Sequence, residues 1–594
     1  MKKFTMFSSV LASALMLTVA SCSSDDVTGG DAQNGKGATS YLAVNIQNVG
    51  SAPASRAYVQ GNGTYEDGTG AESKISKVRF YFFNGDGSPY LLVNNDATQQ
   101  SVNFMDQSVE TDGADHDHTD EIKTKAVLVL NGETKAVPAS VIAVINPEVL
   151  DNTTLHSGTM TLSELRTSAT GTKFYDATNG FVMSNSVYES AGQDVCSTPV
   201  ANNVFATSDA ALKKTVDIYV ERVNAKVNAK IDATYQRAGE SAPAWNKNTE
   251  GKYQIEVGSI DVTTYDNTNS TSATKTYPVY AVVQGWQVAD ANGKAEVCKQ
   301  INTSWYAGEL GISPWTTSDY HRCFWSKSVP FTQGAQGGTN HPVNPKFEDI
   351  KLSLSDDFST TPVYTLPNTP TEVITNPKTS LNTLTKLIVA AKLVYKDGDG
   401  NYKSAQVCQY RGLTYLGEDA VKKQIVSGFG QYFKKTTTAT GDVYKSIEAS
   451  DITFKTVSGS SEVKNYEVVP TLASTVGEIY VKNGETWTTA SKEDVNTALA
   501  KETAQVRSTD GDTYYYTPVK HLGDAGKLGE YGIVRNHSYQ VTIQNIKGFG
   551  TPVYDPSKEI DPMIPSDDNT YLAASIKVLS WRVVSSKVDL DQTK

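Results

Sequence analysis

The chain has 594 residues, enough for two to four domains of ordinary size. Hydrophobic residues make up 39 %, below the roughly 45–50 % of an average globular chain, while 31 Tyr and 44 Gly favour many short strands joined by polar loops. The formal net charge is −12 and no Lys/Arg cluster stands out, which argues against a nucleic-acid partner.

The five cysteines are widely separated and include no CxxC pair, so their spacing indicates neither a disulfide framework nor a zinc site. They are Cys22, Cys196, Cys298, Cys323 and Cys408.

The one long apolar run of the chain stands at its N-terminus and is typical of a secretory signal. Lys2 and Lys3 precede residues 4–20, a run too short and too polar for a comfortable membrane span. The Val-Ala-Ser-Cys of residues 19–22 resembles a bacterial lipobox, in which the Cys receives diacylglycerol and becomes the mature N-terminus. We therefore predict a signal peptide over residues 1–21 and lipidation at Cys22. An ordinary signal peptidase site with a coincidental Cys remains the alternative.

After a polar tether the hydrophobic pattern changes to period two. Leu42, Val44 and Ile46 fall on one face, which predicts a strand. A loop of small residues follows, and its solitary Arg56 before Ala57 is an accessible site for a trypsin-like protease.

Residues 216–231 contain one odd step between two runs of alternating apolar residues. Such a step indicates a β-bulge or a crossing between sheets. We place the boundary between two domains here, with an N-terminal domain over residues 57–222 and a C-terminal domain over residues 223–570.

Helical stretches are few. One is predicted after Thr161, which has capping-box spacing to Glu164, and others over residues 418–425 and 493–501. Residues 387–395 and 402–410 predict a hairpin around residues 396–401. The predicted fold is therefore mainly all-β, with two β-sandwich-like domains and small helical insertions.

The sequence has no HExxH, P-loop, GxSxG or GxGxxG motif, so we predict no catalytic residue, no cofactor and no resident metal. The segment Asp397–Asn401 begins like a calcium loop, but Tyr402 and Cys408 stand where such a loop needs Gly and Glu, so a hairpin turn explains it better. A weak surface metal site and a plain polar loop both fit one acidic cluster: Asp112, Asp115, His116, Asp117, His118 and Asp120.

Five aromatic residues in the middle of the chain have two interpretations. They could line a glycan platform, but aromatic packing between two sheets is commoner. They are Trp305, Tyr306, Trp315, Tyr320 and Trp325.

The C-terminal third carries the most specific motifs. They are Tyr514–Tyr516, His521-Leu, the YGIVRNHSY of residues 531–539, the QVTI of 540–543, the KGFGTPVYDP of 547–556 and the VLSWRVV of 578–584. Together they resemble the C-terminal signature of the type V fimbrilins, the minor-fimbria major-subunit family of Bacteroidetes-type bacteria. Residues 181–186, 220–226 and 319–325 resemble other parts of the family, so the resemblance extends, with divergent stretches, from Cys22 to the end.

The resemblance implies a shaft subunit of a cell-surface fimbrium that supports adhesion and is exported as an outer-membrane lipoprotein precursor. An arginine-specific protease would cut the Arg56–Ala57 bond and remove a propeptide, residues 22–56, whose strand contains Leu42, Val44 and Ile46. Shaft subunits of the family keep both a cleavable Arg and a strand-forming tail, as this chain does.

Donor-strand exchange would then join subunits head to tail, with a donor segment over residues 571–594 whose alternating face includes Val584, Val588 and Leu590. Accessory anchor and tip fimbrial subunits would be further partners. Residues 41–46 and 571–576 share Tyr, Leu, Ala and Ile in one register, which leads to the hypothesis that they fill equivalent sheet positions. The alternative function is a fimbrial tip adhesin, or a monomeric surface lipoprotein that binds glycans or proteins.

Overall fold

The structure is a computed structural model of the chain. It describes residues 39–48, 72, 74–93, 100–108, 123–133, 136–151, 153–155, 158–186, 188–190, 193–266, 271–301, 326–330, 340–375, 383–411, 413–456, 467–506, 510–521, 523, 525–553, 555–560 and 571–580.

Strands dominate the fold, and the helices are short, which confirms the predicted mainly-β class. The helix predicted after Thr161 is present, because the Thr161 hydroxyl accepts from the Glu164 N–H and the Glu164 carboxylate accepts from the Thr161 N–H. No helix in the described ranges is both long and apolar enough to cross a bilayer. The helices are α2 (Leu162–Thr167), α3 (Ser208–Leu212), α4 (Glu418–Ser427), α5 (Lys492–Leu499), η1 (Pro147–Val149), η2 (Ala201–Asn203), η6 (Phe347–Asp349) and η8 (Ala449–Asp451); the sequence did not predict α3.

The N-terminal part is built on a nine-stranded sheet with the order β13-β1-β14-β9-β5-β2-β3, in which β4 also pairs with β1 and β12 with β5. Alternation along β2 separates two cores: Phe80 and Phe82 pack with Leu42 on one face, and Tyr81 and Phe83 pack with Leu165 on the other. The strands are β1 (Thr39–Asn48), β2 (Lys77–Phe83), β3 (Phe104–Ser108), β4 (Lys123–Asn131), β5 (Ser140–Ile145), β9 (Met183–Asn185), β12 (Thr198–Pro199), β13 (Val204–Phe205) and β14 (Val216–Arg222).

A crossing between sheets, rather than a bulge, explains the odd step in residues 216–231. β14 belongs to the nine-stranded sheet, whereas β15 (Ala225–Ile231) belongs to a four-stranded sheet with the order β20-β15-β33-β35. The chain passes from one sheet to the other at Val223 and Asn224. The other strands of the second sheet are β20 (Val363–Thr365), β33 (His537–Lys547) and β35 (Tyr571–Ser580).

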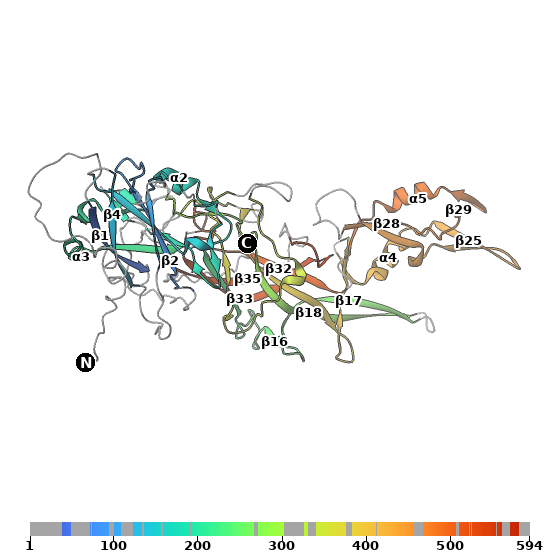
Figure 1. Ribbon diagram of the computed structural model, residues 1–594. Coiled ribbons are helices and arrows are strands. Elements are labelled where there is room, and N and C mark those ends of the chain that lie inside the picture. The colour runs from blue at the N-terminus through green and yellow to red at the C-terminus, as the bar shows by residue number, and fades with distance from the viewer. Residues whose placement is uncertain are drawn as a thin grey trace, which may run out of the picture.

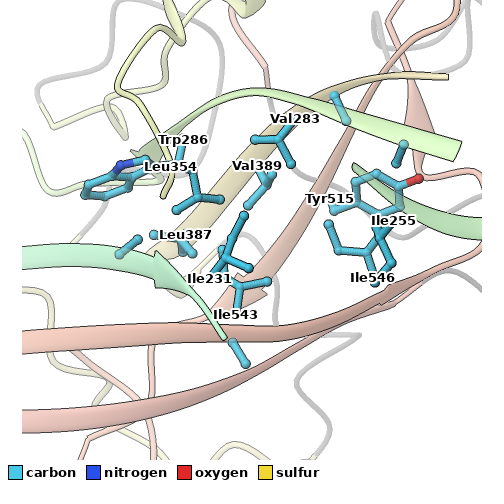
Figure 2. Packing of buried hydrophobic residues seen from close by; sticks show 14 of the residues in the cluster. Ile231, Ile255, Val283, Trp286, Leu354, Leu387, Val389, Tyr515, Ile543 and Ile546 are labelled. Atoms are coloured by element: carbon cyan, nitrogen blue, oxygen red, sulfur yellow. The ribbon is translucent and has the colours of Figure 1, made fainter. Parts of the chain in front are cut away.

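The four-stranded sheet faces a seven-stranded sheet with the order β16-β17-β18-β21-β32-β34, in which β22 also pairs with β21. Figure 2 shows Ile231 and Ile543 of one sheet beside Leu387 and Val389 of the other, and all four side chains belong to one buried core. This packing of two sheets is the predicted β-sandwich. The strands are β16 (Trp245–Lys247), β17 (Tyr253–Asp266), β18 (Thr271–Ala289), β21 (Lys386–Lys396), β22 (Tyr402–Ser404), β32 (Asp512–Pro518) and β34 (Thr551–Pro552).

The predicted hairpin around residues 396–401 is confirmed only in its first part. The Asp397 carboxylate accepts from the backbone N–H groups of Asp399 and Asn401, which makes this segment the turn between β21 and β22. Beyond β22 the prediction is wrong, because the chain leaves the sheet and residues 407–410 form a strand of another sheet.

Residues 407–506 form a unit with a core of its own, inserted between the neighbouring strands β21 and β32, and Figure 1 shows it at the end of the molecule opposite β1. One sheet has the order β24-β23-β31-β28-β27 and the other β26-β25-β29-β30. The sequence analysis did not separate this unit from the C-terminal domain. Its strands are β23 (Val407–Tyr410), β24 (Leu413–Leu416), β25 (Tyr432–Thr438), β26 (Gly441–Ser446), β27 (Ile452–Thr456), β28 (Glu467–Leu472), β29 (Ile479–Asn483), β30 (Thr486–Ala490) and β31 (Ala504–Val506).

Short pairs complete the described strands. They are β7 (Tyr175–Asp176) with β8 (Gly180–Phe181), β10 (Tyr188–Ser190) with β11 (Gln193–Val195), and β19 (Ala295–Glu296) with β6 (Thr170–Gly171).

Candidate assembly site

The strand predicted to be removable, β1, lies between other strands of the nine-stranded sheet rather than at its edge. On one side it pairs antiparallel with β4, from Thr39 opposite Asn131 to Gln47 opposite Lys123. On the other side its second half pairs parallel with β14, and its first half pairs antiparallel with β13. Both edges of β1 therefore take part in ladder hydrogen bonds.

The side chains of β1 complete the core beneath it. Leu42 and Val44 are both 0 % exposed and pack in one cluster with Phe80, Leu128 and Ile218. These contacts confirm that the predicted apolar face of β1 is buried at Leu42 and Val44. Ile46 lies in the same strand, in register with Ile218 of β14; its side chain lies outside the described part of the structure.

Loss of β1 would open a slot with two unpaired edges. Within the described sheet β4 pairs with β1 alone, and β14 would lose its partner along Val216–Val220. Unpaired N–H and C=O groups and exposed apolar side chains both raise the free energy of the protein. An added strand would pair the backbone groups and cover the apolar side chains. The geometry can therefore accept a strand from outside the molecule.

We expect Leu42→Ala to lower the free energy of unfolding of the N-terminal part of the uncleaved chain by about 2–5 kcal/mol, because a fully buried Leu leaves a cavity. Urea unfolding, monitored through the hydrogen exchange of β2 and β5, would measure this change in the free energy of unfolding. Thr39→Ala is the matched control: Thr39 lies in the same strand but is exposed, so the expected change is below about 1 kcal/mol. Equal stability of the two variants would contradict the burial of β1.

Glu72, which follows the predicted cleavage loop in the chain, is fixed by three groups from other elements. Its carboxylate lies 3.0 Å from Lys226 Nζ of β15 and accepts a 2.6 Å hydrogen bond from the Tyr364 hydroxyl of β20. Its carbonyl accepts from Arg222 Nε at 2.7 Å. Burial, reinforced by the bond to Glu72, raises the pKa of Tyr364 and keeps its hydroxyl protonated as a donor. The chain after the loop is thus held against the four-stranded sheet.

A second buried charge cluster lies at the end of β14. Glu221 is 3.0 Å from Arg535 Nε and 3.4 Å from Lys299 Nζ, and Arg535 Nη2 donates to the Ser184 hydroxyl at 2.9 Å. Burial of an ion pair costs desolvation, and removal of one partner costs more than the pair contributes. This cluster therefore fixes the strand beside the slot to segments of the C-terminal part.

The hypothesis that residues 41–46 and 571–576 fill equivalent sheet positions is wrong. β1 has a parallel neighbour, β14, and an antiparallel neighbour, β4. In the C-terminal sandwich the strand with one parallel and one antiparallel neighbour is β33, between β15 and β35. β35 itself pairs antiparallel with β33 over its whole length, so residues 571–580 belong to the sheet of their own molecule.

Several predicted residues lie outside the described part of the structure: Cys22, Arg56 and Ala57, the tail residues Val584, Val588 and Leu590, the acidic cluster of residues 112–120, and the five aromatic residues between 305 and 325. In the described ranges no group of three or more His, Cys, Asp or Glu side chains is placed to hold a metal ion.

The strands around β33 and β35 carry the sequence signature of the C-terminal third, and a family model matches this region. Residues 508–587 match the family described as "Major fimbrial subunit protein type IV, Fimbrillin, C-terminal". The C-terminal third of the chain is therefore similar to the C-terminal region of the fimbrilins. This match confirms the resemblance to the fimbrilins that the sequence motifs of the C-terminal third indicate.

Solved structures similar to this chain include a putative cell adhesion protein from Parabacteroides distasonis, with 12 % identity, coverage of 93 % of this chain and 99 % of that chain, and a TM-score of 0.36. The fimbrilin FimA from Porphyromonas gingivalis has 13 % identity, the same two coverages and a TM-score of 0.34. The tip fimbrial protein Mfa3 from P. gingivalis, with a C-terminal truncation, has 10 % identity, coverages of 91 % and 99 %, and a TM-score of 0.27. No curated protein matches the sequence.

Two histidines of the fimbrilin signature are buried between β33 and the segment after β32. The His521 and His537 rings lie 5.2 Å apart, His521 Nδ1 lies 3.0 Å from the Tyr539 hydroxyl, and His537 Nδ1 lies 2.8 Å from the Arg535 carbonyl. Burial lowers the pKa of His537 to about 4, and burial together with the neighbouring His537 lowers the pKa of His521 well below its usual value. Both imidazoles are therefore neutral in the fold at pH 7.

This burial predicts a loss of stability in acid. In the unfolded chain His537 binds a proton below its ordinary pKa of about 6.5, whereas in the fold it does so only near pH 4. The contribution of His537 to the free energy of unfolding is therefore complete above pH 6.5 and is lost as the pH falls from 6.5 to 4. We expect the free energy of unfolding to lose roughly 3 kcal/mol from this residue over that pH range. Glu296, whose pKa burial raises to about 7, acts in the opposite direction, because its contribution is lost as the pH rises from about 4.5 to 7.

The comparison of wild type with His537→Gln isolates the histidine contribution, because Glu296 is common to both. Urea unfolding at pH 7.5 and pH 4.5 should give a stability difference between the two chains that shrinks by roughly 3 kcal/mol at the lower pH. A difference that stays constant with pH would show that His537 titrates normally.

Proposed function

We propose that this protein is a fimbrilin and a shaft subunit of a cell-surface fimbrium, exported as a lipoprotein attached to the outer membrane through Cys22 and activated by an arginine-specific protease that cuts Arg56–Ala57. The cut frees β1, and the tail of a second copy, with Val584, Val588 and Leu590, fills the slot. Anchor and tip subunits would complete the fimbrium.

The observation that supports this proposal best is the position of β1. A strand that is buried on its core face and paired along both edges precedes the segment that contains Arg56, so a single cut there separates it from the rest of the chain. Because residues 571–580 pair with β33 of their own sheet, we propose that the donor lies within residues 581–594.

We expect the contact between the slot of one subunit and the tail of the next to be strong. Leu42 and Val44 together represent about 3–6 kcal/mol of apolar burial that a donor must replace, and each main-chain hydrogen bond adds about 1 kcal/mol. Donation of a tail to the next molecule is a heterologous contact that does not close on itself, so its product is a filament.

The test is incubation of the purified precursor with an arginine-specific protease. We expect a chain that starts at Ala57 and forms a ladder of oligomers on gels run without boiling. Clean cleavage at Arg56 that leaves only monomers, with the tail intact, would contradict the proposal.

A further inference from the structure

The sheet of β25, β26, β29 and β30 has two faces of different chemistry. Its strand register places Phe433, Tyr444, Tyr480 and Trp487 on one face, which we call the aromatic face. Ile479 lies on the opposite face and packs in the core of the inserted unit with α4 and α5. The aromatic face therefore points away from that core.

The four rings form one cluster. Tyr444 and Trp487, from the two outer strands, stack with centroids 4.0 Å apart and an interplanar angle of 4°. Phe433 meets Trp487 edge to face at 4.8 Å, and Tyr480 meets Tyr444 in the same way at 5.3 Å. Each ring is thus held by its neighbours, and a ligand that binds them orders few side chains.

Polar groups on the same face are available to a ligand. The Trp487 indole N–H and the Tyr444 hydroxyl make no hydrogen bond to any residue that the structure describes. Lys482 Nζ lies 5.9 Å from the Trp487 ring centre, and Lys435 lies 3.3 Å from the Asp442 carboxylate. Hydrogen-bond donors and acceptors therefore surround the four rings of the aromatic face.

The composition of the aromatic face distinguishes between classes of partner. On these four strands the aliphatic side chains, such as Ile479 and Val443, lie on the opposite face, while Thr437 and Thr489 share the aromatic face. Protein interfaces are depleted in Lys, Asp and Ser at their centres and rely on apolar contact area. Flat rings beside hydroxyl, amine and carboxylate groups match instead the two surfaces of a sugar ring, one of C–H groups and one of hydroxyls. The Asp442 carboxylate is held on this face by Lys435 and by the Thr437 hydroxyl.

We propose that the aromatic face binds a neutral oligosaccharide, with the C–H face of a hexopyranose against the Tyr444–Trp487 cluster. Lys482 and the paired Lys435 and Asp442 would bind its hydroxyl groups. Figure 1 shows β25 and β29 at the end of the molecule opposite β1, so the slot and this face can be occupied at the same time.

The experiment titrates the full, uncleaved chain with hexasaccharides of glucose, N-acetylglucosamine and mannose, and with desialylated mucin before and after removal of its glycans. Saturation-transfer NMR and tryptophan fluorescence report binding. We expect at least one carbohydrate to bind and Trp487→Ala to weaken it at least tenfold. Val443→Ala, on the opposite face of the same strand as Tyr444, should leave the affinity unchanged.

Tyr444→Ala provides a second variant if Trp487→Ala unfolds the sheet, and hydrogen exchange of β25 checks the fold of both. The proposal is overturned if no carbohydrate binds at about 10 mM, if binding survives both substitutions, or if glycan-free mucin binds as well as the intact form. The last result would indicate a polypeptide partner. Because the chain is uncleaved, these outcomes are independent of filament assembly.

Discussion

A chain that lacks residues 585–594 is expected to form no filaments after proteolysis, while its thermal unfolding stays close to that of wild type. Assembly should fail because the segment contains Val588 and Leu590, two of the three apolar residues proposed to enter the slot. Stability should persist because β35 ends at Ser580, so the truncation removes none of the strands that the structure describes. Electron microscopy and unboiled gels measure assembly, and differential scanning calorimetry measures stability.

The matched control for the truncation alters the other face of the tail. Asp589→Asn with Asp591→Asn keeps the alternating apolar face, so filaments should form at close to the wild-type yield. Val588→Asp with Leu590→Asp should behave like the truncation, because burial of an unpaired carboxylate in an apolar slot is costly. Filaments of normal yield from the truncated chain would place the donor strand elsewhere.

The second large effect is expected from Arg56→Ala. The protease should leave this variant intact, β1 should stay between β4 and β14, and the chain should remain a lipoprotein precursor that does not assemble. The amount of filament should fall below the limit of detection by microscopy. Arg411→Ala is the matched control, because Arg411 is exposed but lies in the inserted unit, far along the chain from the proposed cut.

A rescue variant separates the loss of cleavage from other effects of the substitution. Replacement of residues 55–57 with the recognition site of an unrelated, sequence-specific protease should restore assembly when that protease is added, and only then. Filaments from uncut Arg56→Ala would show that loss of β1 is not required.

Local patterns in the sequence were sufficient to predict some of the strands but not their neighbours. The period-two alternation of Leu42 and Val44 predicts a half-buried strand wherever it lies. The odd step before Val223 indicates either a bulge or a crossing between sheets, and the structure shows the crossing. In contrast, shared letters in residues 41–46 and 571–576 led to a wrong equivalence, because strand composition reports burial and not the direction of the neighbouring strands.

The charged groups that fix the sheets around the slot were missed for a different reason. Glu72 and Lys226 are separated by 154 residues, and no local pattern connects them. The signal in the sequence is a charged residue within an apolar strand, as at Glu221 among the buried residues of β14, because such a group needs a partner from elsewhere in the fold. The inserted unit was also hidden, because its strands have the same alternation as those of the sandwich that it interrupts.

N-terminal sequencing of protomers isolated from native fimbriae tests the central claim most directly. The exchange of β1 for a neighbour's tail predicts a single sequence that begins at Ala57, with no acylated residue. Protomers in assembled fibres that still begin at a lipid-modified Cys22 would contradict it.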